Sequence, residues 1–155
     1  MGRQRLARRL RATGKNSFAD YLDALEKDRG DEWERFVNSL TTNLTSFFRE
    51  PHHFPILADY LKKHAGKRPL KIWCCAASTG EEPYSIAMTV QEALGNAASN
   101  VSIIASDLDT NVLATADKGV YAADRVEKMS PEQVKRFFLK GTGNQEGYVC
   151  VRPEL

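Results

Sequence analysis

Cysteine is scarce in this 155-residue chain, and its scarcity excludes several classes of protein. The three cysteines are odd in number and Cys74 and Cys75 are adjacent, so no disulfide framework is indicated. The Cys-x-x-Cys spacing of a zinc site is also absent. The adjacent His52 and His53 would point to different faces of a helix or strand, which makes them a poor pair of metal ligands. We therefore expect a reduced, cytoplasmic protein that has no metal site.

Long hydrophobic runs are missing as well. No apolar stretch approaches the roughly 20 residues of a membrane span, and the first residues lack the apolar core of a signal peptide. With 42% hydrophobic and 27% charged residues, the composition is that of a globular protein. The length suffices for one ordinary domain, or for a small domain and part of a larger one.

Acidic residues are absent from residues 1–15, which carry six basic residues, whereas residues 16–40 carry seven acidic and three basic ones. Positive charge concentrated in one arm indicates an acidic partner. The arm could instead be a solvated helix face. It has no interleaved aromatic residues and no nucleic-acid motif follows it, so an acidic protein surface suits it as well as nucleic acid does.

Helical periodicity fills the first 40 residues and predicts a small all-α domain over residues 1–40. The first predicted helix runs from Arg3 to Ala12 and ends at Gly14. Ser17 is typical of a helix cap, and Asp31 is the candidate cap of a third helix. The expected core residues are Phe18, Leu22 and Leu25 in the second helix, and Trp33, Phe36, Val37 and Leu40 in the third.

A strand, a short loop and a helix follow at residues 70–94. Leu70–Cys75 is typical of a strand buried on both faces, and Pro83–Leu94 has helical spacing with Gly95 as its stop. The loop between them holds small residues and two carboxylates. Small side chains let a ligand approach the backbone, and the N–H groups of the helix start would face it. This pattern predicts a nucleotide-type site, but the lone Gly80 disfavours a dinucleotide oxidoreductase.

A second buried strand, Val101–Ala105, ends in two acidic residues. An acid at this strand tip is where nucleotide-binding α/β folds place a carboxylate on ribose hydroxyls, which makes Asp107 the candidate. Asp107 could alternatively be a solvated loop residue. We expect Asp109 or Thr110 to cap the helix that follows, which runs through Asp117.

The segment Thr41–Glu50 contains a second set of polar candidates. Asn43, Thr45 and Arg49 could serve only as capping and loop residues. They could also converge on a charged ligand if the segment is helical, since arginine binds carboxylates with a forked pair of hydrogen bonds.

Few strands are visible in the remaining chain. The other predicted elements are a helix from Pro55 to about Lys63, a turn at Gly66–Pro69, a connection at Tyr121–Met129, a helix capped by Ser130 whose apolar side includes Phe138 and Leu139, a turn at Gly141–Gly147 and a strand at Tyr148–Arg152. An open α/β sheet normally needs more strands to cover its helices. We therefore expect residues 41–155 to be part of a larger α/β domain.

Four stretches match the motifs of a known family. They are Thr42–Glu50, His52–Pro55, Trp73–Ala87 and Ala105–Asp109. Together they closely resemble the chemoreceptor glutamate O-methyltransferases of bacterial chemotaxis, the CheR family. The resemblance implies an N-terminal helical domain followed by a Rossmann-like methyltransferase domain. It also implies S-adenosylmethionine as methyl donor and receptor glutamate carboxylates as acceptors.

The resemblance further implies roles for individual residues. The basic arm, with Arg5, Arg8, Arg9 and Arg11, would dock on the acidic methylation region of a receptor. Asn43, Thr45 and Arg49 would line the cofactor and acceptor side, and Arg49 is the candidate catalytic residue that orients the acceptor carboxylate. Glu82 would bind the amino acid moiety of the donor, although Glu81 could exchange roles with it, and Asp107 would lie at the ribose and adenine end.

The family normally continues past Leu155 and places a small antiparallel β-subdomain near residues 146–155, with Tyr148–Arg152 as its first strand. We therefore expect a truncated chain with an incomplete pocket, which binds the cofactor weakly or not at all and associates with itself through open sheet edges. The alternative is a catalytically incomplete fragment that acts only as a receptor-binding or interaction module.

Overall fold

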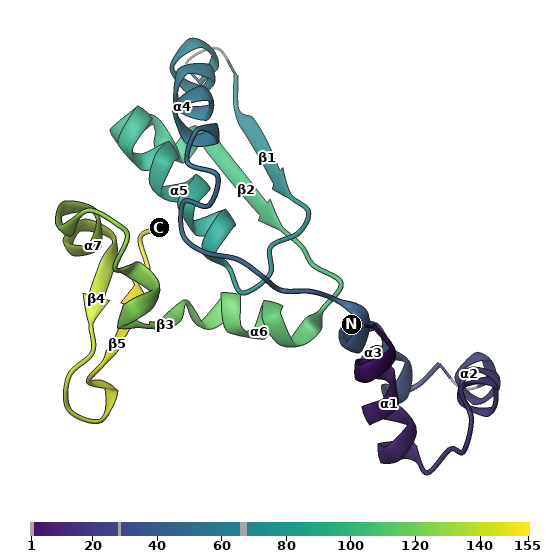
Figure 1. The fold of residues 1–155 in the computed structure, drawn as a ribbon. Helices are drawn as coiled ribbons and strands as arrows, with labels where there is room; N and C mark the ends of the chain where they lie inside the picture. Colours follow the sequence, from purple (N-terminus) through teal and green to yellow (C-terminus); the bar gives the residue numbers. More distant parts are fainter. Residues whose placement is uncertain (1, 28, 66–67) are drawn as a thin grey trace. The chain divides into compact units, whose positions relative to one another are not determined.

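The computed structural model describes residues 2–27, 29–65 and 68–155, so the turn predicted at Gly66–Pro69 lies partly outside the described residues. The chain divides into two compact units (Figure 1). The helical unit comprises Met1–Asn43 with Leu108–Asn111, and the α/β unit comprises Leu44–Asp107 with Val112–Leu155.

Three helices build the helical unit: α1 (Gly2–Thr13), α2 (Phe18–Lys27) and α3 (Asp31–Leu40). All three were predicted. Gly14 ends α1 with a φ of +66°, a conformation that glycine adopts without strain. The Ser17 hydroxyl accepts a hydrogen bond from the Asp20 N–H at 3.1 Å, which confirms the predicted cap of α2.

The core of the helical unit differs from the prediction. Tyr21 and Leu25 are its buried apolar residues among those described, whereas Phe18 and Leu22 are exposed. The predicted core residues of α3 are half-buried, apart from Leu40, which is exposed. A unit of three short helices has too little interior to enclose a full apolar face on every helix.

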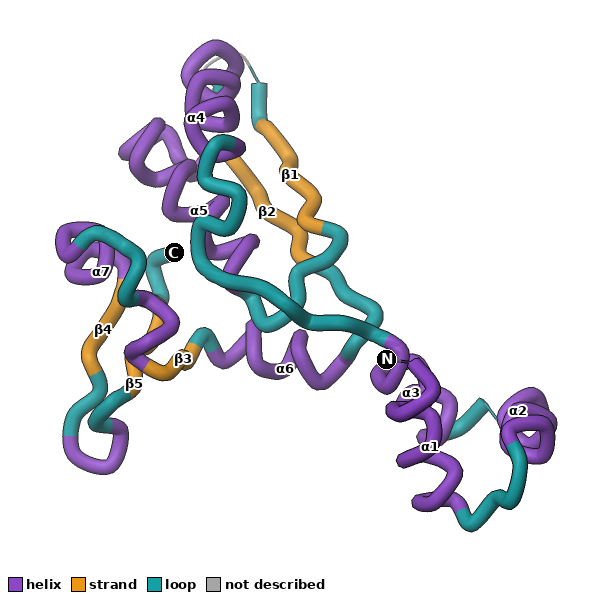
Figure 2. The backbone as a smooth tube through the Cα atoms, in the orientation of Figure 1, coloured by secondary structure: helices purple, strands orange, loops and turns teal. Residues whose placement is uncertain are grey.

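Two parallel strands form the first sheet of the α/β unit. Strand β1 (Leu70–Cys74) pairs with β2 (Val101–Ala105), with Leu70 opposite Val101 (Figure 2). Helices α4 (His53–His64) and α5 (Glu81–Leu94) flank this sheet, and a 3₁₀ turn at Gly95–Asn100 leads into β2.

The side chains of α4, α5 and the two strands pack into one cluster, whose buried members are Leu61, Ala65, Leu70, Val90 and Ala98. The expectation that β1 and β2 are buried on both faces is wrong. Trp73 is 70% exposed and Ile104 is 54% exposed. The packing against α4 and α5 uses only alternate residues of each strand, and the intervening residues point to the other face.

A second, antiparallel sheet follows α6 (Thr110–Lys118). Its strands are β3 (Val120–Ala122), β4 (Phe138–Lys140) and β5 (Tyr148–Val151), and β5 lies in the centre. Helix α7 (Pro131–Phe137) and 3₁₀ turns at Ala123–Val126 and Gly143–Gln145 connect them. The predicted cap of α7 is confirmed, because the Ser130 hydroxyl accepts from the Gln133 N–H at 3.2 Å.

Tyr148–Arg152 was predicted to be the first strand of this sheet. In chain order, the corresponding strand β5 is the third, after β3 and β4. The predicted connection at Tyr121–Met129 contains part of β3, and Phe138 and Leu139 belong to β4 instead of a helix. Three-residue strands are too short to show an alternating pattern, so only their pairing with β5 reveals them.

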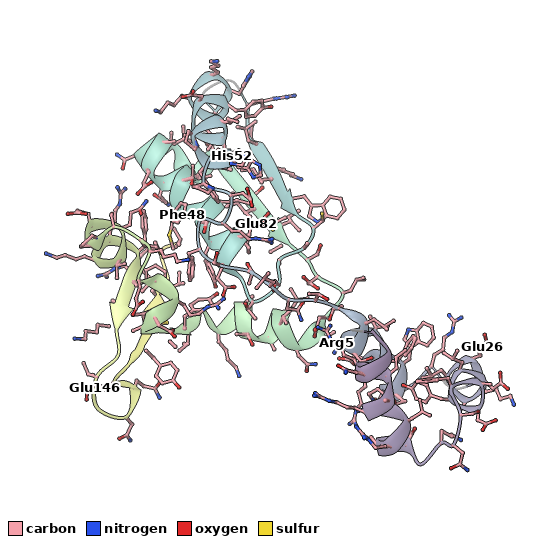
Figure 3. All side chains as sticks on the ribbon, viewed as in Figure 1. Arg5, Glu26, Phe48, His52, Glu82 and Glu146 are labelled. Atoms are coloured by element: carbon pink, nitrogen blue, oxygen red, sulfur yellow. The ribbon has the colours of Figure 1, made fainter. Side chains whose placement is uncertain are left out.

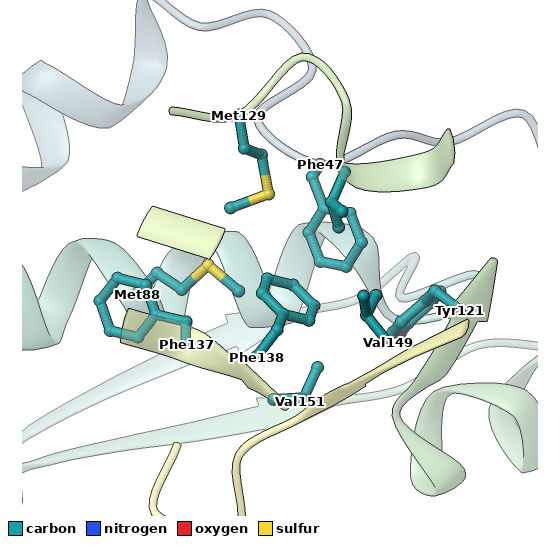
Figure 4. Packing of buried hydrophobic residues seen from close by; sticks show 9 residues of the cluster. Phe47, Met88, Tyr121, Met129, Phe137, Phe138, Val149 and Val151 are labelled. Carbon is teal, nitrogen blue, oxygen red and sulfur yellow. The ribbon is translucent and has the colours of Figure 1, made fainter. Parts of the chain in front are cut away.

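Phe47 joins the loop at residues 44–50 to the core beside this sheet. Its ring packs edge-on against Tyr121 of β3 and Phe138 of β4, with ring centroids 5.0 and 5.3 Å away (Figure 4). Met88 of α5 belongs to the same buried cluster. The loop is therefore fixed at its middle by an aromatic anchor.

Candidate functional site

The loop between β1 and α5 has a backbone that requires glycine. Gly80 has a φ of +101°, and a Cβ at this position would lie 2.6 Å from the Tyr121 hydroxyl and 2.9 Å from the Ala116 Cβ. Ser78 also has a positive φ, +49°, and its buried Oγ has no hydrogen-bond partner among the described residues. A strained residue with an unsatisfied buried hydroxyl is typical of a ligand site.

Asp107 connects this loop to the end of β2. One of its carboxylate oxygens accepts a hydrogen bond from the Ser78 N–H at 2.8 Å. Two further backbone bonds, from Ala77 to the Ser106 carbonyl and from Ser106 to the Cys74 carbonyl, hold the two strand ends together. Asp107 is half-buried at the carboxyl edge of the parallel pair, where ligands of open α/β sheets bind.

The two neighbouring carboxylates at the start of α5 have different surroundings. Glu81 is 1% exposed, forms an ion pair with Arg125 and accepts from the Thr79 hydroxyl at 2.5 Å. Glu82, which is labelled in Figure 3, is exposed, and its Oε1 lies 3.6 Å from the Cys74 Sγ. Burial, together with the Glu82 charge, raises the pKa of the Cys74 thiol to about 11. Glu81 is thus engaged inside the protein, and Glu82 is open to solvent.

The segment 44–50 is a loop, so the helical arrangement considered for its polar residues is wrong. Thr45 is half-buried and its carbonyl accepts a hydrogen bond from Arg125 at 2.9 Å. Arg49 is exposed, and its Nη1 donates to the Leu44 carbonyl at 3.2 Å. The loop conformation is therefore supported by arginine side chains that bond to its backbone carbonyls, and by Phe47.

Asn43 belongs to the helical unit, whereas Thr45, Arg49, Glu82 and Asp107 belong to the α/β unit. The Asn43 amide nitrogen donates to Asp109 at 2.8 Å. Asp109 is buried, and it also accepts from the Thr41 hydroxyl and from the Asn111 N–H. Asp109 is therefore the cap of α6, one of the two residues that the sequence allowed.

The four arginines assigned to docking are not equivalent. Arg9 donates from Nε to Glu32 at 3.0 Å, and the Tyr21 hydroxyl donates to the same carboxylate at 2.7 Å. Hydrogen bonding from Arg9 lowers the pKa of Glu32. Arg5 donates to the Thr41 carbonyl. Arg8 and Arg11 are exposed and lie three residues apart on α1, so they present their charges on one face.

Sequence reasoning missed Arg125 and Tyr121. Both lie in the stretch after α6, Tyr121–Met129, that was interpreted as a connection. The Tyr121 hydroxyl donates to the Thr79 carbonyl at 2.7 Å and so supports the β1–α5 loop. Neither residue belongs to a motif of recognisable spacing in the sequence. Only the antiparallel sheet brings these residues to the loop.

Two family models together cover almost the whole chain. The model described as the SAM-binding domain of CheR methyltransferase matches residues 43–155. The model of its all-alpha domain matches residues 2–41. The chain belongs to the CheR methyltransferase family. The predicted family and fold class are confirmed, and the description of the longer match agrees with S-adenosylmethionine (SAM) as cofactor.

Curated members of the CheR family are similar along nearly the entire chain. The chemotaxis protein methyltransferase of Escherichia coli is 51% identical over 97% of this chain and 52% of its own length. Chemotaxis protein methyltransferase 2 of Pseudomonas aeruginosa is 54% identical, again over 97% of this chain and 54% of its own length. The chain spans about half the length of these relatives. Among the described residues, no helix combines the length and apolar character needed to cross a membrane.

Proposed function

We propose that this CheR-family chain carries the cofactor loop and the receptor-docking helix of a cytoplasmic methyltransferase. Its reaction is the transfer of the SAM methyl group to glutamate side-chain carboxylates of bacterial chemoreceptors. The observation that carries the proposal is the exposed Glu82 at the start of α5, beside a glycine turn, within the stretch that matches the SAM-binding domain.

The residues around the β1–α5 loop fit SAM chemically. The cofactor carries an ammonium group, which suits the open carboxylate of Glu82, and hydroxyl groups, which suit an acid at the tip of β2 such as Asp107. The buried Ser78 hydroxyl lacks a partner among the described residues and can bond a polar ligand atom. Thr45 and Arg49 lie in the loop at 44–50 and are proposed as further cofactor contacts. A cofactor role of Asn43 stays a prediction from the family motif.

Methyl transfer to a carboxylate places few demands on side-chain chemistry. SAM supplies an activated methyl group bound to a sulfonium. The acceptor glutamate is already an anion at neutral pH, because its pKa lies near 4.3, so no general base is needed. The protein then contributes mainly by orientation, which can supply roughly 7–11 kcal/mol in well-aligned systems.

We assign the orientation of the acceptor to Arg49. Its guanidinium is exposed, and its contact with the Leu44 carbonyl uses one of five N–H donors. An open guanidinium can hold a carboxylate with two parallel hydrogen bonds. In a methylation assay with the full-length protein, Arg49→Ala should lower kcat more than it raises the dissociation constant of S-adenosylhomocysteine (SAH). Normal turnover by this variant would exclude the role.

The docking surface on the helical unit is proposed to be Arg8 and Arg11. They are exposed on one face of α1, whereas Arg5 and Arg9 are hydrogen-bonded within the unit. The acidic methylation region of a chemoreceptor is the partner that suits this charge. Attraction between exposed charges of this kind weakens as the salt concentration rises.

The binding of SAH and NAD by the chain tests the class of ligand. We expect SAH, followed by NMR at millimolar concentration, to shift resonances of the β1–α5 loop with weak affinity, and NAD to leave them unchanged. Equal responses to both ligands would contradict the methyltransferase proposal. A tight one-to-one complex of SAH with the monomer would contradict the expectation that this pocket is incomplete.

A receptor-binding module without catalysis is the second candidate. The exposure of Trp73 and Ile104 on the β1–β2 sheet favours it, since parallel sheets are normally covered on both faces. The same exposure supports our expectation that the chain associates with itself. A methylation assay on this chain, with receptor fragments as acceptor, separates the two candidates, and sedimentation at several concentrations measures the association.

A further inference from the structure

A single side-chain nitrogen connects the loop at 44–50 to the start of α5. The Nη2 of Arg125 donates to the Thr45 carbonyl at 2.9 Å and forms an ion pair with Glu81. Arg125 lies in the 3₁₀ turn that follows β3, so the contact joins three segments that are distant in the sequence. We name this contact the Arg125 bridge.

The bridge rests on a buried and well-bonded carboxylate. Glu81 is 1% exposed, and its second oxygen accepts from the Thr79 hydroxyl at 2.5 Å. The Thr79 carbonyl in turn accepts from Tyr121, whose pKa is raised by burial of the phenol. Because Glu81 is held on both oxygens, it provides a fixed point from which Arg125 can position the loop.

The loop that Arg125 contacts is strained. Phe48 has a φ of +51°, which is unfavourable for a bulky side chain. Its N–H donates to the Ser85 hydroxyl at 2.9 Å, and this hydroxyl donates to the Glu81 carbonyl at 2.6 Å. The side chain and the carbonyl of Glu81 therefore both support the loop. Strained backbone of this kind persists only where its surroundings hold it in place.

We propose that Arg125 is a positioning residue that holds the backbone of residues 44–50 on the start of α5. The loop contains Thr45 and Arg49, so the bridge sets where these two residues meet the cofactor and the acceptor. This part of the inference rests on the proposed function. The bridge itself does not depend on it, because its contacts lie within the α/β unit.

Hydrogen exchange of the loop amides tests the bridge without any ligand. Arg125→Met retains an apolar chain of similar length and removes both contacts. The hydrogen-bonded amides of the loop, those of Phe48 and Arg49, should therefore exchange about tenfold faster. Arg125→Lys should largely restore their protection, since one ammonium nitrogen can serve both oxygens that the single Nη2 now contacts. Lys128→Met is the matched control, because Lys128 is exposed three residues away and the change in charge is the same.

Two results would overturn the bridge: unchanged exchange at 44–50 in Arg125→Met, or one common acceleration of all amides of the α/β unit. The second would mean that Arg125 only stabilises the fold. If Arg125→Met does not fold because Glu81 is left buried without its partner, the comparison moves to Glu81→Gln with and without Arg125→Met. The double variant must still exchange faster at the loop than Glu81→Gln alone.

SAH binding then separates positioning from the proposed function. If the unmodified chain binds SAH, Arg125→Met should weaken binding several-fold and Lys128→Met should leave it unchanged. Equal affinity of Arg125→Met and the unmodified chain, despite faster loop exchange, would contradict the positioning role. If the unmodified chain does not bind SAH, the same comparison in the full-length protein decides the positioning role, and equal SAH affinity of the two full-length proteins would contradict it. The exchange experiment on this chain still decides whether the bridge exists.

Discussion

Replacing Gly80 by alanine should destabilise the α/β unit more than the same change at a turn glycine that has open space around it. The alanine would have to adopt a φ near +101°, and its Cβ would lie 2.6 Å from the Tyr121 hydroxyl and 3.0 Å from the Ala116 Cα. The positive φ costs about 1–2 kcal/mol for an L-residue. Overpacking costs about 1–3 kcal/mol more, and moving Tyr121 would break its bond to the Thr79 carbonyl.

Gly147→Ala separates the two costs. Gly147 has a φ of +87° but nothing within 4 Å of an added Cβ. This control should lose only about 1–2 kcal/mol, whereas Gly80→Ala should lose about 4 kcal/mol once the close contacts are included. Urea unfolding, followed by tryptophan fluorescence and by circular dichroism, gives the difference between the two variants. Equal losses would refute the claim that Tyr121 packs directly against the β1–α5 loop.

Three further predictions concern the helical unit. The double variant Arg8→Ala, Arg11→Ala should weaken binding to an acidic receptor fragment about tenfold at low salt, as measured by calorimetry. Arg9→Ala should instead lower the melting temperature, because Arg9 is paired with Glu32. The Glu32 carboxyl has its pKa lowered in the folded state, so its stabilising contribution is present above the unfolded pKa of about 4.3 and is lost as the pH falls through the folded value. Glu32→Gln should therefore flatten the acid side of the stability profile, and an unchanged profile would contradict the assignment.

The strand–loop–helix at residues 70–94 could be predicted from the sequence because several signals agree there. Apolar β-formers, small loop residues and helical spacing all indicate the same elements, and Gly95 marks the end of α5 as expected. The caps at Ser17 and Ser130 follow from local chemistry and were equally predictable. Local rules therefore located the β1–α5 loop.

The parts that depend on long-range pairing could not be predicted. Strands β3 and β4 are three residues long, and they exist because they pair with β5. The different environments of Glu81 and Glu82 also depend on this sheet, since Arg125 reaches Glu81 from the turn after β3. Two adjacent glutamates are indistinguishable in sequence until a distant arginine selects one of them.

The central claim is that Glu82 at the start of α5 binds the cofactor, and an SAH titration of Glu82→Gln tests it most directly. Glu92→Gln is the control, because Glu92 lies on the same helix and the change in charge is identical. We predict that Glu82→Gln removes the SAH-induced shifts of the β1–α5 loop while Glu92→Gln retains them. Retention of the shifts in Glu82→Gln, with an affinity equal to that of the unmodified chain, would contradict the claim.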